Sequence, residues 1–178
     1  MSCQNRTLKG IQNDCMGSVA GLKKLYFGLA DAISAVTYTD SAYTINSLTL
    51  KSGEHLYEYY VTDESSSLTS QMTRNNQNGV FYITNTINAT FVRMTPAKNL
   101  EMQALISEKL FCIAQDNNNY YWAIGVRDSF ATASQGNAQS GQAFDDLSGY
   151  QLQVDHRSGF YAYAISEEIV NSLLPQSN

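Results

Sequence analysis

Residues 80–94 read VFYITNTINATFVRM, and this stretch decides the fold class of the chain. Apolar and polar side chains alternate here over about a dozen residues, which is typical of a β-strand with one buried face. The apolar face is interrupted only by Asn85 and consists of Phe81, Ile83, Ile87, Ala89 and Phe91. Because strands usually run to about 5–6 residues, we expect this one to project beyond the core of one domain.

One helix is expected directly after this strand, over about residues 95–109. Thr95 is a good N-cap, and Pro96 suits the first helical position because its missing N–H costs nothing there. Further short strands are expected over residues 23–29, 35–38, 43–50, 55–61, 110–115, 120–126, 150–155 and 160–165. Together these patterns predict a mainly β fold, an antiparallel β-sandwich or open barrel with one flanking α-helix.

The chain divides into three parts in this interpretation. Residues 1–16 are an N-terminal arm without sustained periodicity, residues 17–165 form a single β domain, and residues 166–178 are a C-terminal tail that either forms a short helix or trails off. Two polar stretches lie inside the domain. Residues 63–78 are expected to be a strand pair or an extended loop, and residues 127–148, rich in Gly, Ala, Ser and Gln, a long loop. Residues 150–165 are expected to form the last hairpin.

The composition favours a surface that partners can cover. Only 15% of the 178 residues are charged, and the polar bulk is supplied instead by Asn, Gln, Ser and Thr. Such groups are cheaper to desolvate at an interface than charges are. A compositional bias of secreted or low-complexity sequences is the alternative explanation. The net charge of −5 argues against sequence-specific binding of nucleic acid.

The cysteines and the hydropathy pattern exclude several other classes. There are three cysteines and no CxxC motif, which argues against a disulfide framework and a zinc site and for folding in a reducing compartment. The first sixteen residues contain no apolar segment typical of a signal peptide. No apolar run is long enough to span a bilayer, so we expect no membrane partner.

The sequence contains no convincing catalytic constellation. Cys112, His156 and Asp155 contain the residue types of a nucleophile–base pair, but Phe111 and Ile113 flank the cysteine and indicate a buried, inert thiol. Phosphate-binding and nucleophile-elbow motifs are absent from the sequence. We therefore expect that the protein is not an enzyme and has no cofactor and no metal. The twelve tyrosines favour strand packing and interface contacts over a carbohydrate platform.

A succession of short motifs resembles a family of virion structural proteins. These motifs are GLKKLY at 21–26, YEY at 57–59, NGVFY at 78–82, DNNNYYWAIG at 116–125, SGQA at 140–143 and LSGYQL at 147–152. The family occurs in tailed phages of gut bacteria, including crAss-like phages, and the resemblance covers roughly residues 17–165. It implies a tail-tube-like β-sandwich or barrel whose subunits join their sheets around a ring, with an extended hairpin or loop docking on the next ring.

This resemblance gives the expected function and partners. The chain is expected to be a virion protein, made in the host cytoplasm, that forms a cyclic homo-oligomer, six-fold or twelve-fold, in the tail tube or collar. Its neighbours would be other tail, collar or portal rings, and genomic DNA would pass through the channel without specific binding. The alternatives are a head-side or adhesin-like virion protein and a carbohydrate-binding β-sandwich module.

The expected contact residues lie in the arm and the two polar stretches. Candidate contacts between subunits are Leu8, Ile11, Asn78, Gly79, Gly136 and Gly141. Candidate acidic residues of the channel wall are Asp145, Asp146 and Asp155, because a wall that DNA must pass should offer few cations.

Overall fold

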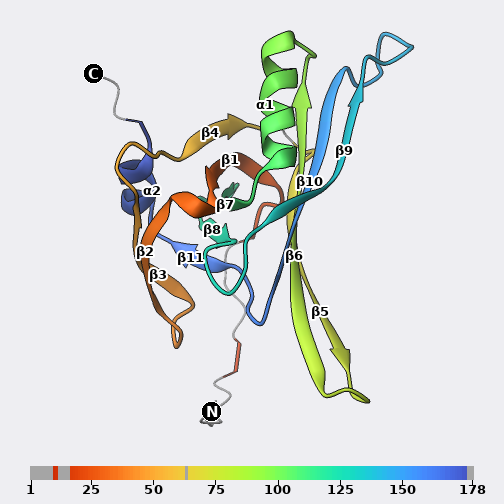
Figure 1. The fold of residues 1–178 in the computed structure, drawn as a ribbon. Coiled ribbons are helices and arrows are strands. Elements are labelled where there is room, and N and C mark those ends of the chain that lie inside the picture. The colour runs from red at the N-terminus through yellow and green to blue at the C-terminus, as the bar shows by residue number, and fades with distance from the viewer. Residues whose placement is uncertain (1–9, 12–16, 63, 176–178) are drawn as a thin grey trace.

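A computed structural model describes residues 10–11, 17–62 and 64–175, which form two open β-sheets and two short helices (Figure 1). In spatial order the larger sheet contains β2 (Ile33–Thr39), β3 (Thr44–Leu50), β11 (Tyr163–Ile165), β8 (Tyr121–Ile124), β7 (Leu110–Asp116), β1 (Leu22–Leu29) and β4 (Tyr57–Tyr60). The smaller sheet contains β5 (Ser67–Asn75), β6 (Val80–Val92), β10 (Gly149–Ser158) and β9 (Thr132–Gln139). All pairs are antiparallel except β11 with β3. The prediction of a mainly β, antiparallel fold is therefore confirmed.

The first hydrophobic core lies between the two sheets. Leu25 and Phe27 of β1 share this cluster with Ile87 of β6 and Val154 of β10, and all four side chains are almost completely buried. Helix α1 (Pro96–Ser107) adds Met102 and Leu105 to the same cluster. The apolar face expected for residues 80–91 is thus the face that β6 turns toward this core, although Phe81 remains 59% exposed.

A second core covers the opposite face of the seven-stranded sheet. Tyr26 lies in this cluster while its neighbours in β1 lie in the first, because successive strand residues point to opposite faces. Helix α2 (Glu167–Leu173) contributes Val170 and Leu173, and the amide of Leu56 donates to the carbonyl of Leu173 over 3.0 Å. Of the two conformations left open for the segment after residue 165, the chain adopts the short helix.

Helix α1 begins as the sequence predicts and ends two residues earlier. Thr95 is the N-cap, and its hydroxyl accepts a hydrogen bond from the amide of Lys98 over 3.2 Å. The helix stops at Ser107 because Glu108 is extended and Leu110 already pairs with Ala131 through two backbone hydrogen bonds. The chain thus changes from helix to strand within three residues.

Two sequence expectations about the C-terminal half are wrong. Residues 127–148 are not one long loop, because residues 132–139 form β9 along the edge of the small sheet. Most side chains of β9 are exposed, so the strand lacks the apolar period that reveals a half-buried strand. The expected last hairpin is also absent: β10 runs on to Ser158 in the small sheet, and β11 pairs in the large one. The chain crosses between the layers where the sequence predicted a tight turn.

None of the helices in the described ranges is long and apolar enough to cross a membrane.

Candidate functional site

The outer face of the four-stranded sheet is a continuous polar surface. Residues that pair across antiparallel strands share a face, so each register row places four or three side chains side by side. One row consists of Gln135, Gln153, Asn88 and Ser67, and a second of Thr132, Asp155, Thr86 and Thr69. Amides and hydroxyls therefore dominate this face of the sheet.

A hollow of about 330 Å³ lies on this polar face, where β9, β10 and β6 run together. Its wall contains the amide side chains of Asn88, Gln135, Asn137, Gln151 and Gln153. Neutral amides present both donors and acceptors and carry no charge. The hollow is therefore suited to weak, water-mediated contact rather than to tight binding of an ion.

The charge on this face is confined to Asp155 and its neighbour on the same strand, Arg157. Partial burial opposes ionisation of Asp155, but hydrogen bonds from Thr86, Ser134 and Gln153 outweigh it, so the pKa of Asp155 lies below its usual value. The hydroxyl of Thr86 donates to Asp155 over 2.7 Å. The carboxylate is thus ionised at neutral pH and held within the polar network.

The β5–β6 hairpin projects beyond the rest of the domain at one end of the small sheet (Figure 1). At its tip the side chain of Asn75 accepts hydrogen bonds from the amides of Gln77 and Asn78 over 2.9 and 3.4 Å. Gly79 closes the turn with φ of +64°, a conformation that favours glycine. The tip carries exposed apolar side chains, namely Met72, Val80, Phe81 and Tyr82. A group of exposed apolar side chains on a projecting hairpin is typical of a surface that binds a partner.

The β9–β10 connection forms the opposite end of the same sheet (Figure 1). The carboxylate of Asp146 accepts hydrogen bonds from the amides of Gln142 and Ala143, both over 2.8 Å, and these bonds lower the pKa of Asp146. Gly141 has φ of +74°, and Phe144 is fully exposed. This end therefore carries an acidic, ordered turn with one uncovered aromatic ring.

The structure separates the residues that the sequence grouped. Asn78 and Gly79 lie at the hairpin tip, and Gly141 lies at the opposite end of the sheet. Gly136 is inside β9, where it pairs with Leu152, and not in a loop. Ile11 is 99% exposed, and Leu8 lies outside the described residues.

The three candidate wall acids are likewise not brought together. Asp155 points from the polar face, while Asp145 and Asp146 lie in the turn beyond the end of that strand. The turn with Asp145 and Asp146 ends where β10 begins at Gly149, and Asp155 lies about 20 Å further along this strand. Sequence reasoning also missed Met72 and Gln135, although the long alternation of β6 already indicated a strand that projects beyond the core.

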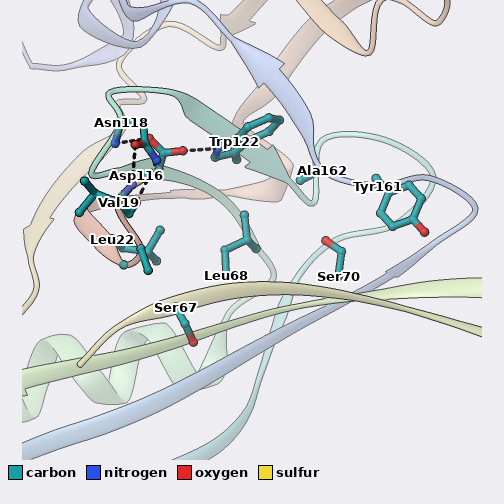
Figure 2. A pocket seen from close by; sticks show the side chains of 12 residues that line it. Val19, Leu22, Ser67, Leu68, Ser70, Asp116, Asn118, Trp122, Tyr161 and Ala162 are labelled. Atoms are coloured by element: carbon teal, nitrogen blue, oxygen red, sulfur yellow. Dashed lines mark hydrogen bonds between the residues drawn. The ribbon is translucent and has the colours of Figure 1, made fainter. Parts of the chain in front are cut away.

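A second candidate site is a pocket of about 530 Å³ between the two sheets (Figure 2). Trp122 and Tyr161 line it, together with Asp116, Asn118 and Leu68. The Asp116 carboxylate accepts hydrogen bonds from the amides of Asn118 and Tyr120 and from the indole of Trp122, over 2.9, 2.8 and 3.0 Å. These hydrogen bonds within the chain satisfy the Asp116 carboxylate, which is the charged group of the pocket.

The structure also places the three side chains that were considered for catalysis, Cys112, Asp155 and His156. Cys112 is fully buried in the first core, and burial raises the pKa of its thiol. Asp155 points from the outer face of the small sheet, whereas His156, the next residue, points inward. Within residues 10–11, 17–62 and 64–175 no group of three or more His, Cys, Asp or Glu side chains is arranged to hold a metal ion.

No protein-family model matches this chain, and no curated protein matches it significantly.

Proposed function

We propose that this chain is a structural, non-catalytic subunit of a bacteriophage virion that assembles with its own copies into a ring of the tail tube or collar. The observation that carries the proposal is the four-stranded sheet: it combines a polar face, two outer edges without a partner strand in the described chain, and a projecting hairpin. The succession of short motifs between residues 21 and 152, which resembles that family, supports the same class.

Unpaired strand edges are a liability for a monomer and a bonding surface in an assembly. In the small sheet these edges are β5 and β9, which lie on opposite sides of β6 and β10. A contact between β5 of one copy and β9 of the next joins two different surfaces, and such contacts close into a ring when the rotation between copies closes. The sheets of successive copies then form one continuous wall.

In this arrangement the polar face lines the channel. DNA carries about one negative charge per 1.7 Å of axis, and each Lys or Arg that it meets releases counterions and holds it. The rows of amides and hydroxyls on β5, β6, β9 and β10 offer few such contacts, since Arg157 is their only basic member. The wall therefore lets DNA pass without specific binding.

The test combines assembly with DNA retention. The purified chain should form rings in electron micrographs, and those rings should bind duplex DNA weakly at low salt. A variant with Thr69→Lys and Gln153→Lys places two cations on the polar face and should form rings that hold DNA. Rings with equal DNA retention for both proteins would show that another face lines the channel, and a chain that stays monomeric would refute the proposal.

A carbohydrate-binding role is the second candidate, because Trp122 and Tyr161 both line the pocket of Figure 2. Aromatic rings beside hydroxyl and amide groups suit the apolar faces of sugars. Trp122 is the only tryptophan of the chain, so its fluorescence reports directly on occupation of this pocket. A saturable fluorescence change with oligosaccharides that Tyr161→Ala abolishes would support this candidate, and an unchanged spectrum would remove it.

A further inference from the structure

A small apolar cavity lies where α1 crosses the ends of β1 and β4. Its volume is about 150 Å³, and its walls include Phe27, Tyr57, Tyr59, Ala104 and Leu105. The rings of Phe27 and Tyr59 meet edge to face with centroids 5.1 Å apart. An apolar cavity of about this size can hold a group as large as benzene. One branched aliphatic side chain of a partner therefore fits it.

The mouth of the cavity is acidic. Glu101 and Glu108 line it, and among the described residues neither carboxylate forms an ion pair. Glu101 accepts a hydrogen bond from the hydroxyl of Tyr59, whose pKa is raised by burial and by this bond. Glu108 is the C-cap of α1, and the last turn of the helix contains no basic residue. Because a helix C-terminus carries partial negative charge, this mouth favours a cation.

The surface around the cavity can accept an extended segment. Strand β4 is an edge of the seven-stranded sheet, so its outer side has no partner strand in the described chain. Tyr57 on this strand is 52% exposed, and Leu100 on α1 is 75% exposed. A groove between an edge strand and a helix is a common binding mode for extended peptides, which add as a further strand.

The N-terminal segment of the chain has the complementary chemistry. Residues 1–9 read MSCQNRTLK, in which Leu8 stands between Arg6 and Lys9 and acidic residues are absent. The next apolar residue, Ile11, is 99% exposed, so the described part of its own chain does not cover it. Strand β1 begins at Leu22, whereas the cavity lies near Leu29 at its other end, so about 23 Å of strand separates the two. An N-terminal segment that precedes one end of β1 in the sequence and a cavity at the other end suit a head-to-tail contact between copies.

We propose that residues 1–9 of one copy bind along β4 of a neighbouring copy, with Leu8 in the α1–β4 cavity and with Lys9 and Arg6 facing Glu108 and Glu101. This contact rests on the proposed function, since it specifies which surfaces join successive subunits. The contact places basic side chains beside the C-terminus of α1, whose last turn contains no basic residue. It also covers the exposed apolar side chains around the cavity, Tyr57 and Leu100.

The first test measures binding without requiring rings. A labelled peptide of residues 1–11 is titrated onto the full-length chain carrying Arg6→Glu and Lys9→Glu, so that the protein's own arm does not compete. We expect saturable binding that Leu8→Asp in the peptide weakens about tenfold or more, since burial of one leucine side chain is lost. Ala104→Phe in the protein should fill the cavity and abolish binding, whereas Ala97→Phe, on α1 outside the cavity, should not. Absence of saturable binding, or equal effects of the two alanine variants, would overturn the proposal.

The second test distinguishes a neighbour's arm from the chain's own arm. Lys9→Glu and Glu108→Lys should each weaken assembly when present alone, because each places like charges together. A mixture of the two variants restores opposite charges at every contact between unlike copies and should recover assembly, measured by native mass. No recovery in the mixture would overturn the contact between copies. Rings that form normally from both single variants would overturn the arm contact while leaving the ring itself intact.

Discussion

Replacement of Asn85 by alanine should destabilise the domain near the point where the β5–β6 hairpin leaves the core. Asn85 is fully buried, and it is the polar residue that interrupts the apolar face of β6. Its side chain accepts a hydrogen bond from the hydroxyl of Ser70 over 2.6 Å and donates to the carbonyl of Phe160 over 3.2 Å. The ring nitrogen Nδ1 of His156 lies 3.4 Å from the same amide.

The size of the effect follows from these contacts. Each neutral hydrogen bond contributes about 1 kcal/mol, and each buried polar group left without a partner costs about 1–3 kcal/mol. Among the described residues no group forms a hydrogen bond with the buried Nε2 of His156, and Asn85→Ala also removes the amide beside Nδ1. We therefore expect Asn85→Ala to lower the free energy of unfolding by about 3–5 kcal/mol. At about 2–4 °C per kcal/mol, the melting temperature should fall by about 10 °C.

Urea unfolding of the dilute chain, followed by the fluorescence of Trp122, measures this loss. The matched control is Asn88→Ala, which makes the same chemical change on the exposed face of the same strand and should stay within about 0.5 kcal/mol of the parent. Hydrogen exchange should also accelerate in β5 and β6 for Asn85→Ala alone. Equal losses for the two variants would refute the reasoning that the buried hydrogen bonds of Asn85 secure the hairpin.

Three further predictions concern pH, one loop and the hairpin tip. Burial lowers the pKa of His156 below 6.5. The free energy of unfolding should therefore be constant above that pH and decrease as the pH falls below it. The difference in this free energy between pH 7.5 and pH 5.5, measured by urea unfolding, should be smaller for His156→Gln than for the parent. Gly141→Ala should lower the free energy of unfolding by about 1 kcal/mol more than Gly79→Ala does. Both glycines have positive φ, but only at Gly141 would an added Cβ clash, since it would lie 2.8 Å from Asp146. Equal melting temperatures of the two variants would contradict this prediction. Phe81→Ser should leave the melting temperature unchanged and reduce assembly in light scattering, and unchanged scattering would exclude a role of the tip.

The parts of the fold that the sequence predicts are those in which local chemistry and packing agree. The alternation around Ile87 identifies β6 and its buried face, and Thr95 with Pro96 identifies the start of α1. Strand β9 escapes prediction because it lies at an edge and buries almost no side chain, so Gln135 and its neighbours resemble a loop. The crossing from β10 to β11 depends on which sheet each strand joins, and short-range patterns do not contain that information.

The candidate site divides in the same way. The polar face of β6 could be read from the sequence, since Thr84, Thr86 and Asn88 alternate with the core residues. The rows that extend this face across β5, β9 and β10 depend on register between distant segments. The α1–β4 cavity likewise joins residues more than seventy positions apart, such as Phe27 and Glu101, and only the folded chain brings them together.

Electron microscopy of the purified, full-length chain across a range of concentrations, together with its native mass, tests the central claim most directly. We predict closed rings with one cyclic symmetry, six-fold or twelve-fold, an open channel, and a mass equal to that number of 19.7 kDa subunits. A stable 19.7 kDa monomer at high concentration, alone and beside the neighbouring virion proteins, would contradict the account.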